Sequence, residues 1–331
     1  MPVETRRPIL AILGTRFVDF DVERRVVGDV EIVSGAGRDR AEVLGVAGRA
    51  DVILAGAAPR FDAETLASLD CRGIVRLGVG VDTVDFDAAR RQGIWVSYVP
   101  DYGTESVALH AVTLALAAVR RLPMAERHLV SGGWGFGHLR PLHLPRALTV
   151  GVIGFGRIGR RTAQMLAGVG FERFLVADPE VSEEELAGSG LDASARLTSV
   201  SEVLAGSDLV TLHAPPPAEG PLLGGDELSA MKTGSVLVNT ARGALIDTDA
   251  LVAALAAGRP AVAALDVFER EPVDASVFAS VADQVILTPH MSWYTEETEL
   301  ELRRQGAAEA RRILDGERPL HPVVTPEEEP A

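Results

Sequence analysis

Short apolar runs alternate with amphipathic stretches along the first hundred residues. The stretches between the runs have helical spacing, as in 38–47, 61–69 and 86–92. The apolar runs have the length of strands and lie at 8–13, 30–33, 52–55, 73–77 and 94–98. This alternation predicts βαβ units and therefore a parallel sheet. Thr104 is placed to cap a long apolar helix from Glu105 to about Leu122, which Pro123 ends.

A second alternating series begins at residue 148. Strands are predicted at 148–153, 173–177, 208–212, 235–238, 262–266 and 284–287, and a charged amphipathic helix at 297–315 follows them. The chain of 331 residues is long enough for two domains, each with its own core. We therefore expect an α/β protein with two doubly wound parallel sheets.

The segment 123–147 breaks the pattern. Trp134 and Phe136 are interleaved there with four glycines, and prolines follow. The segment is either a loose loop or an arm that becomes ordered against another surface. Aromatic residues are enriched in subunit contacts, which favours the arm.

Composition narrows the class of protein. Apolar residues make up 47% and charged residues 24%, as is usual for a soluble globular protein. The net charge of −15 argues against a nucleic-acid partner, because binding to phosphates needs clustered Lys and Arg. Cys71 is the one cysteine, so no intrachain disulfide can form. The first apolar run, Ile9 to Leu13, is too short for a signal or a membrane span. We expect a cytoplasmic protein without a membrane partner.

A glycine-rich loop follows the apolar run at 148–153 and opens a helix. The loop reads Gly154-Phe155-Gly156-Arg157-Ile158-Gly159. Gly154 allows a tight turn, Gly156 lets the backbone approach a pyrophosphate, and Gly159 lets helix and strand pack closely. The helix N-terminus then offers free N–H groups to the phosphates. Arg157 either contacts the pyrophosphate or is solvated.

Asp178 ends the next apolar run, nineteen residues after Gly159. A carboxylate at this position accepts hydrogen bonds from the ribose hydroxyls of the adenosine. It also repels a 2′-phosphate, and the next three residues contain no Arg or Lys. The predicted cofactor is therefore NAD rather than NADP. No metal site is predicted.

Three polar residues follow later strands of the second series: Arg242, Glu271 and His290. Ligands of open α/β sheets bind outside these carboxyl ends. Arg holds a carboxylate with a two-pronged fork, and His transfers protons at neutral pH. A nearby carboxylate raises the pKa of a His, and both Glu271 and its neighbour Glu269 are candidates for that role. The three residues together suit the reduction of a 2-oxo acid by a hydride donor.

Three segments around these residues resemble the signatures of the D-isomer-specific 2-hydroxyacid dehydrogenase family. They are Val238–Gly243, Leu265–Pro272 and Thr288–His290, and Arg76–Asp82 is similar to the family's substrate loop. The resemblance spans nearly the whole chain. The stretch from His290 to Glu297 is most similar to the C-terminal binding protein branch, which also has a Trp three residues after the catalytic His. One departure is Leu109, before His110, where the family often has an acidic residue.

The resemblance implies a role for each matching residue. Arg242 binds the substrate carboxylate, His290 is the acid/base, and Glu271, which precedes the Pro, is the catalytic carboxylate. Further cofactor contacts are implied at His213, Ala214, Thr240, Ala241 and Asp266, the last of these at the nicotinamide carboxamide. Substrate contacts are implied at Arg76, Val79, Gly80 and Trp293. Trp293 favours an apolar substrate side chain, although core packing explains an aromatic there equally well.

The resemblance also implies the domain organisation and the activity. A flavodoxin-like substrate domain comprises 1–101 and 293–331, and a Rossmann NAD-binding domain comprises 102–292 and carries the dimerisation arm 123–147. The implied activity is the NAD-dependent interconversion of a small 2-oxo acid and its D-2-hydroxy acid by a homodimer. The alternative is an NAD(H)-sensing protein that recruits peptide partners, like the C-terminal binding protein corepressor. The intact Arg, Glu and His favour the enzyme.

Overall fold

The computed structural model describes residues 6–57, 59–191 and 194–326. The chain divides into two compact units. Unit 1 contains the residues up to Gly103 and those from Thr295 on, and unit 2 is Thr104–Tyr294. The chain thus crosses between the units at 103/104 and 294/295, whereas the sequence places these crossings at 101/102 and 292/293.

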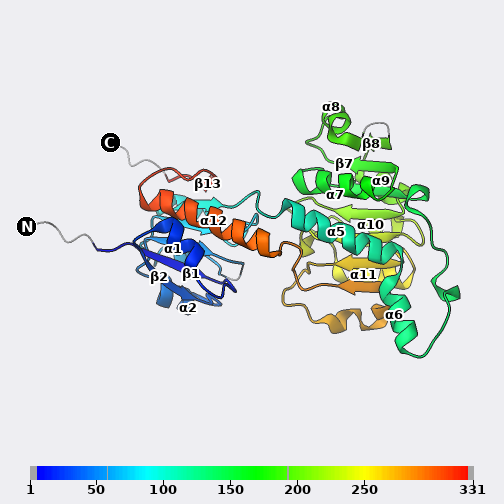
Figure 1. Ribbon diagram of the computed structural model, residues 1–331, viewed down its shortest axis with the longest axis horizontal. Coiled ribbons are helices and arrows are strands. Elements are labelled where there is room, and N and C mark those ends of the chain that lie inside the picture. Colours follow the sequence, from blue (N-terminus) through cyan, green and yellow to red (C-terminus); the bar gives the residue numbers. More distant parts are fainter. Residues whose placement is uncertain (1–5, 58, 192–193, 327–331) are drawn as a thin grey trace, which may run out of the picture. The chain divides into compact units, whose positions relative to one another are not determined.

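Unit 1 is built on a sheet with the strand order β13-β5-β4-β3-β1-β2, of which Figure 1 labels β1, β2 and β13. The strands β1 to β5 pair in parallel. The central strands are buried on both faces, which explains why their sequences are continuous apolar runs. The bounds are β1 Ile9–Leu13, β2 Glu31–Gly35, β3 Val52–Ala55, β4 Gly73–Arg76, β5 Trp95–Tyr98 and β13 Pro322–Val324.

Helices cover both faces of this sheet. On one face, α2, α3 and α4 pack on the strands through apolar residues such as Val43, Leu66 and Ala89. On the other, α12 packs on α1, β3 and β4. Gly306 permits this close approach, since a Cβ there would lie 2.3 Å from a Leu77 methyl carbon. The helices are α1 Asp21–Val27, α2 Arg40–Ala47, α3 Ala63–Leu66, α4 Phe86–Arg91 and α12 Glu296–Leu314.

Strand β13 is absent from the sequence prediction, and it pairs with β5 antiparallel. The buried carboxylate of Glu309 on α12 holds this return of the chain. Glu309 accepts hydrogen bonds from the hydroxyl of Ser97 (2.5 Å) and from the N–H of Leu320 (3.1 Å). The apolar run of β13 is three residues long, which is too short for the sequence pattern to predict a strand.

Unit 2 is built on a fully parallel sheet with the order β12-β11-β10-β9-β6-β7-β8. The two parallel-sheet α/β domains confirm the predicted fold class. Strand β8 is a further strand that the sequence prediction misses, because it is short and partly exposed. The bounds are β6 Thr149–Ile153, β7 Arg173–Ala177, β8 Ala195–Leu197, β9 Leu209–Leu212, β10 Val236–Asn239, β11 Val262–Leu265 and β12 Val285–Leu287.

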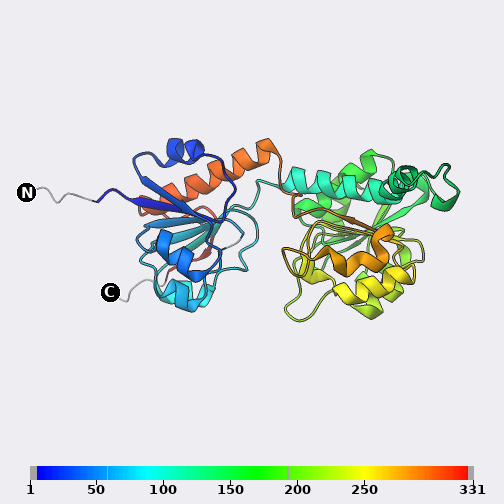
Figure 2. The same ribbon diagram turned by 90° about the horizontal axis from the view of Figure 1, so that it is seen from below.

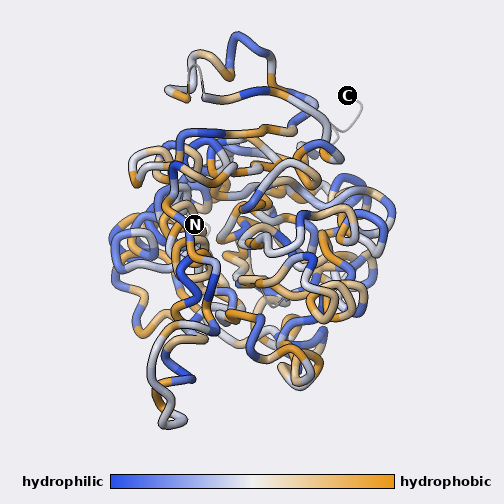
Figure 3. Tube along the Cα trace, turned by 90° about the vertical axis from the view of Figure 1, so that its right-hand side faces the viewer, coloured by the Kyte–Doolittle hydropathy of each residue, from blue (hydrophilic) through white to orange (hydrophobic). Residues whose placement is uncertain are grey.

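Two hydrophobic clusters lie on the two faces of this sheet, as successive side chains of each strand point to opposite sides. Helices α5 and α7 cover one face, and α9, α10 and α11 cover the other (Figure 2). Hydrophobic and hydrophilic residues alternate along the trace in Figure 3, as expected for elements with one buried side. The helices are α5 Thr104–Val119, α6 Leu122–Val130, α7 Arg157–Gly168, α8 Glu183–Leu186, α9 Val200–Gly206, α10 Gly225–Ala230 and α11 Thr248–Ala256. Further helical segments are η1 Gly137–Leu139, η2 Pro145–Ala147, η3 Ala187–Leu191, η5 Gly243–Leu245 and η6 Ala275–Gln284.

The sequence prediction around Pro123 is wrong in one respect. Helix α5 ends at Val119, and Pro123 lies in the first turn of a new helix, α6, rather than at the start of an irregular segment. Proline is tolerated there because the first N–H groups of a helix have no helical partner. In the described residues no single helix is long and apolar enough to cross a membrane. Helices α5 and α6, which meet at an angle of 55°, are together long and apolar enough for a bent span, by length and composition only.

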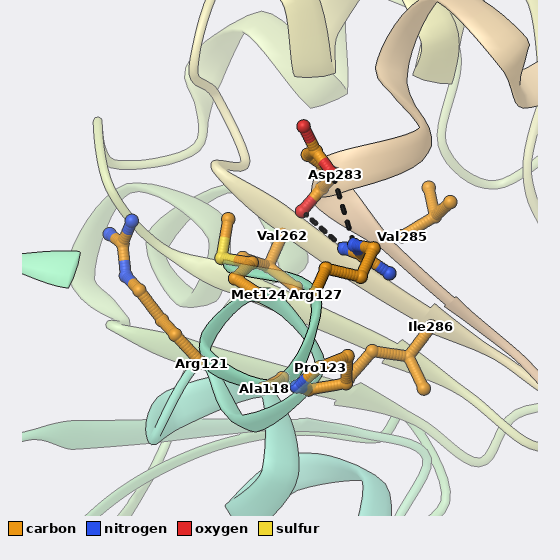
Figure 4. A pocket seen from close by; sticks show the side chains of 9 residues that line it. All are labelled: Ala118, Arg121, Pro123, Met124, Arg127, Val262, Asp283, Val285 and Ile286. Atoms are coloured by element: carbon orange, nitrogen blue, oxygen red, sulfur yellow. Dashed lines mark hydrogen bonds and ion pairs between the residues drawn. The ribbon is translucent and has the colours of Figure 1, made fainter. Parts of the chain in front are cut away.

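Helix α6 is held beside the edge strand β12. The Nε atom of Arg127 lies 3.0 Å from Oδ1 of Asp283, and its Nη2 donates to the Asp283 carbonyl (3.1 Å) (Figure 4). A pocket of about 10 Å³ lies next to this pair, lined by residues that include Met124 and Val285. Such a volume suits one water molecule at most.

A buried ion pair joins the two ends of unit 1. The guanidinium of Arg303 on α12 donates from Nε and Nη2 to the fully buried carboxylate of Glu23 on α1, at 2.9 and 2.8 Å. Asp19 accepts a further hydrogen bond, and the ring of Phe17 lies 4.7 Å from the guanidinium carbon. The Glu23 hydrogen bonds are the main reason why the pKa of Arg303 is raised.

Replacing Glu23 by Ala leaves Arg303 buried without its main partner, so we expect the free energy of unfolding of unit 1 to fall by about 3–5 kcal/mol. Urea unfolding followed by Trp95 fluorescence, with Trp134 and Trp293 replaced by Phe, measures this loss. Glu301→Ala is the control, because the Glu301–Arg304 pair is exposed and contributes about 0–1 kcal/mol. Equal losses in the two variants would contradict this account of the buried pair.

Candidate active site

The carboxyl ends of β9, β10, β11 and β12 lie at one edge of the unit 2 sheet, because neighbouring strands are parallel. The segments that follow these strands are far apart in the sequence and meet at this edge. They carry Thr240, Ala241 and Arg242 after β10, Asp266 and Glu271 after β11, and His290 after β12. The predicted catalytic residues therefore lie in one region of unit 2.

His290 and Glu271 form a hydrogen-bonded pair. Nδ1 of His290 lies 2.6 Å from Oε2 of Glu271, while Oε1 accepts the N–H of Phe268 (3.0 Å). Glu269 instead accepts the hydroxyl of Thr248 (3.1 Å), so the structure pairs Glu271, not Glu269, with the imidazole. Since Nδ1 faces the carboxylate, Nε2 is the nitrogen that can exchange a proton with a ligand.

The pair changes both acidities. The hydrogen bond that His290 donates to Glu271 is the largest influence on His290. With the nearby negative charges it raises the pKa of the imidazole, despite partial burial and the charge of Arg242. For Glu271, partial burial by itself would raise the pKa of the carboxyl. The hydrogen bonds from His290 and Phe268 and the charge of Arg242 outweigh it, so the pKa of the carboxyl is lowered. The pair therefore stabilises the protonated form of His290 and the ionised form of Glu271.

Asp266 holds the loop that carries His290. Its fully buried carboxylate accepts the Thr288 hydroxyl (2.5 Å) and the N–H groups of Met291 (3.0 Å) and Ser292 (2.9 Å). Its backbone carbonyl accepts the N–H of His290 (2.8 Å). These bonds keep His290 at φ 51°, a left-handed conformation that costs energy for a side chain of this kind. The contact of Asp266 with a nicotinamide carboxamide stays a prediction.

Arg242 is positioned by its neighbours after β10. The Asn239 side chain accepts the N–H of Ala241 (3.0 Å) and donates to the Arg242 carbonyl (2.8 Å). Nη1 of Arg242 donates to the Ala241 carbonyl (2.8 Å). Within the described part of the chain, the other guanidinium N–H groups have no protein acceptor. They can bind a carboxylate through two parallel hydrogen bonds.

Gly243 lets the Arg242 segment touch the Glu271 loop. A Cβ on Gly243 would lie 1.9 Å from the carbonyl carbon of Phe268 and 2.0 Å from its oxygen. Only a residue without a side chain permits this approach. The contact joins the two loops directly at their backbones, which sets the separation between the guanidinium and the His–Glu pair.

The glycine loop fits a dinucleotide. Gly154 has φ 88°, and a Cβ there would lie 2.5 Å from the backbone of Ala214 and His213. At Gly159 a Cβ would lie 2.0 Å from the Gly154 carbonyl, whereas at Gly156 it would meet nothing within 4 Å. Gly156 also begins α7 without a capping side chain. The protein thus leaves open space over an uncapped helix N-terminus, where a pyrophosphate binds. Arg157 is exposed and Ile158 half-buried in the first turn.

Other predicted cofactor residues surround this loop. Asp178 accepts the N–H of Phe155 (2.6 Å) through Oδ2 and that of Glu180 (2.9 Å) through Oδ1, which fixes its carboxylate beside the loop. Loss of water around the ring lowers the pKa of His213 to about 3, so this His is neutral. The buried hydroxyl of Thr240 has no hydrogen-bond partner among the described residues. A buried polar group without a partner is costly, and a bound cofactor would relieve it.

The predicted substrate residues lie in different units. Arg76 is buried in unit 1 and donates to the carbonyls of Ala55 (2.6 Å), Gly56 and Gly80 (3.2 Å), so its guanidinium holds the loop that follows β4. Val79 is exposed on that loop. Trp293 is half-buried in unit 2, edge-on to Tyr294 with ring centroids 5.6 Å apart. Substrate contacts at these residues stay predictions.

Sequence reasoning missed four residues that shape the site: Asn239, Gly243, Thr288 and Phe268, the last through its backbone N–H. Asn239 and Thr288 carried a detectable signal, because each is a polar residue at the end of an apolar run. Gly243 and Phe268 act through backbone atoms of two separate loops, and their role depends on the folded arrangement.

The chain is similar to known proteins over most of its length. Residues 112–292 match the family model described as D-isomer specific 2-hydroxyacid dehydrogenase, NAD binding domain. The chain is similar to D-3-phosphoglycerate dehydrogenase of Archaeoglobus fulgidus, 36% identical over 274 residues that cover 82% of this chain and 50% of that one. It is also similar to glyoxylate reductase of Aeropyrum pernix, 33% identical with 84% of each chain covered.

Among solved structures, the fold is similar to that of D-lactate dehydrogenase from Aquifex aeolicus complexed with NAD and lactic acid. The TM-score is 0.83 at 28% identity, covering 96% of this chain and 100% of that one. The chain spans about half the length of the curated phosphoglycerate dehydrogenases that it matches.

Replacing Glu271 by Gln should lower the pKa of His290, because the amide keeps the size of the side chain but loses its negative charge. NMR titration of the imidazole measures the change. Glu269→Gln is the matched control and should leave the titration unchanged, since Glu269 bonds Thr248. An equal shift in both variants would rule out the specific pairing.

The same pair makes stability depend on pH. The raised pKa of His290 stabilises the fold below the ordinary value of 6.5, and this is lost as pH rises through the raised pKa. The lowered pKa of Glu271 stabilises the fold above pH 4.5, the ordinary pKa of a Glu. This stabilisation is lost as pH falls through the lowered pKa. Thermal melts of the wild type and Glu271→Gln should therefore differ most between pH 4.5 and 6.5.

Proposed function

The chain belongs to the D-isomer specific 2-hydroxyacid dehydrogenase family, and we propose that it interconverts a small 2-oxo acid and its D-2-hydroxy acid with NAD(H). The observation that carries this proposal is the hydrogen-bonded pair of His290 and Glu271, which shares the sheet edge of the NAD-binding domain with the open guanidinium of Arg242. A carboxylate clamp and a protonated acid are the two groups that reduction of a 2-oxo acid requires.

Each residue has a defined task in this reaction. Arg242 binds the substrate carboxylate through its unpaired N–H groups and orients the adjacent carbonyl. His290 donates the proton on Nε2 to the carbonyl oxygen as that oxygen gains negative charge, and Glu271 stabilises the imidazolium until then. NADH, when bound, supplies the hydride. In the reverse direction, neutral His290 accepts the hydroxyl proton of the 2-hydroxy acid.

The cofactor is held by residues of unit 2. The first turn of α7 and the glycine loop receive the pyrophosphate, and Asp178 lies where the ribose hydroxyls of the adenosine are expected. A carboxylate there favours NAD over NADP, since it would repel a 2′-phosphate. Thr240 and Ala241 lie nearer the catalytic residues, as expected for the nicotinamide end.

The substrate is a small 2-oxo acid whose side chain we leave open. The similar proteins are named for phosphoglycerate, glyoxylate and lactate, three acids that share a 2-hydroxy or 2-oxo carboxylate and differ in the rest. Trp293, three residues after His290, supports an apolar side chain and is the feature shared with the C-terminal binding protein branch. The raised pKa of His290 supports an enzyme over a pure NAD(H) sensor, because a sensor has no use for a poised acid.

We also propose that the protein is a homodimer. The segment from α6 through η1 exposes large apolar side chains, with Trp134 at 90%, Val130 at 81% and Phe136 at 61%. The guanidinium of Arg140 lies over the Phe136 ring, 5.4 Å from its centroid, and the ring centroids of His128 and His138 are 4.0 Å apart with the rings tilted by 49°. An apolar surface on an ordered segment is typical of a subunit contact.

We expect NADH oxidation with at least one of pyruvate, glyoxylate and 3-phosphohydroxypyruvate. His290→Ala should lower kcat by about 10²–10⁴-fold and leave the Kd for NADH unchanged, because His290 acts only in proton transfer. Arg242→Lys should lower kcat/KM, since an ammonium cannot form two parallel bonds to the carboxylate. Steady-state assays and NADH fluorescence titration measure these effects.

His321→Ala, at an exposed His of unit 1, is the control and should be fully active. Parallel losses of turnover and NADH affinity in His290→Ala would refute its role as the acid. Tight NADH binding without turnover of any 2-oxo acid would favour the NAD(H) sensor instead.

Replacing both Trp134 and Phe136 by Ser should convert the dimer to a monomer, because the exposed aromatic area of the arm is lost. Sedimentation velocity over a range of concentrations measures the change. Leu320→Ser removes a comparably exposed apolar side chain of unit 1 and should leave the dimer intact. A wild type that sediments as a monomer at every concentration would disprove the proposal.

A further inference from the structure

His110 lies on α5, beneath the loop that carries His290. Its Nε2 is 3.1 Å from the hydroxyl oxygen of Thr288 and 3.6 Å from Oδ1 of Asp266. The side chain is 17% exposed, and Ala111 and Val112 beside it belong to the hydrophobic core. Nothing in the reaction described above uses this imidazole.

The contacts determine the direction of the hydrogen bonds. The carboxylate of Asp266 can only accept, and its negative charge is one of the influences that raise the pKa of His290. The one proton of the Thr288 hydroxyl therefore points to Oδ1, 2.5 Å away. The Thr288 oxygen can then only accept from His110, so Nε2 of His110 carries the proton.

This chain of hydrogen bonds ends at His290. Asp266 binds the N–H groups of Met291 and Ser292 through its carboxylate, and the N–H of His290 contacts the carbonyls of both Asp266 (2.8 Å) and Thr288 (3.1 Å). The strained backbone of His290 persists only while these partners stay in place. A shift of Thr288 or Asp266 therefore moves the imidazole relative to Glu271.

We propose that His110 is a positioning residue for the reaction: by donating its Nε2 proton to Thr288, it fixes the Thr288–Asp266 pair and with it the orientation of the His290 imidazole. The proposal rests on the proposed function only for its kinetic consequence. Its structural content, the proton on Nε2 and the coupling to His290, stands apart from any substrate.

A role in packing alone makes a different prediction. Leu has a volume close to that of His and would fill the same space beside Ala111 and Val112, so a packing role predicts that His110→Leu is tolerated. A hydrogen-bonding role predicts instead that His110→Leu is harmful. His110→Gln, which retains an N–H donor at a similar reach, should be tolerated better than His110→Leu.

The test compares four variants: His110→Leu and Thr288→Val, which remove the donor and the hydroxyl, and His110→Gln and Thr288→Ser, which keep them. Thr113→Val, which removes an exposed hydroxyl of the same helix, is the matched control. In the first two variants we expect kcat to fall about tenfold or more, since small misplacements of reacting groups carry large costs. The Kd for NADH should stay unchanged in His110→Gln, Thr288→Ser and Thr113→Val, which leave the Thr288–Asp266 pair in place.

NMR with ¹⁵N-labelled histidine gives the second readout. The wild type should show His110 protonated at Nε2, identified by the loss of its signals in His110→Gln. The pKa of His290 should fall in His110→Leu and Thr288→Val, where the imidazole loses its alignment with Glu271, while Asp266 and Arg242 remain. The double variant His110→Leu/Thr288→Val should be no worse than either single variant, because both break one chain of bonds.

Two results would overturn the proposal: a His110 ring protonated at Nδ1 alone, or a His110→Leu variant with the kcat and the His290 titration of the wild type. A wild type that reduces no 2-oxo acid would instead refute the proposed function. In that case the NMR readouts still decide whether His110 holds His290, so the two failures are distinguishable.

Discussion

The buried carboxylate of Asp266 is the constraint on which the candidate site depends. It lies at the end of β11, is fully inaccessible to solvent, and binds Thr288, Met291 and Ser292, so it determines the course of the loop after β12. A buried carboxylate is stable only when hydrogen bonds replace the water it has lost, and this loop supplies them. The strained backbone of His290 is one consequence, and the alignment of its imidazole with Glu271 is another.

The remainder of the site follows from the parallel sheet. Parallel strands place all their carboxyl ends at one edge, so Arg242 and His290, 48 residues apart, belong to one region. Within that region the separations are set by backbone contacts rather than by long side chains. Gly243 against Phe268 is the clearest case, since the two loops touch where any Cβ would collide. Such contacts fix a site more tightly than flexible side chains can.

Much of the fold could be predicted because its signals are local. The buried strands are continuous apolar runs, and the glycine loop is recognisable from its spacing and its place between strand and helix. The predicted family and the predicted NAD-binding domain are both confirmed. The errors occur where the signal is weak or depends on distant residues. Strands β8 and β13 are three residues long, and Pro123 begins a helix instead of ending one.

By itself, the sequence determined the two α/β domains, the dinucleotide loop and the identity of the three catalytic candidates, since each depends on residue types at a characteristic spacing. Spacing along the chain could not choose between Glu269 and Glu271, two residues apart, and only resemblance favoured the second. The tertiary structure decided it, because the turn after β11 directs Glu271 to His290 and Glu269 to Thr248. It alone also showed the chain of bonds from His110 through Thr288 to Asp266, which joins residues up to 178 positions apart. Hydrogen bonds of this kind form between groups that only folding brings together.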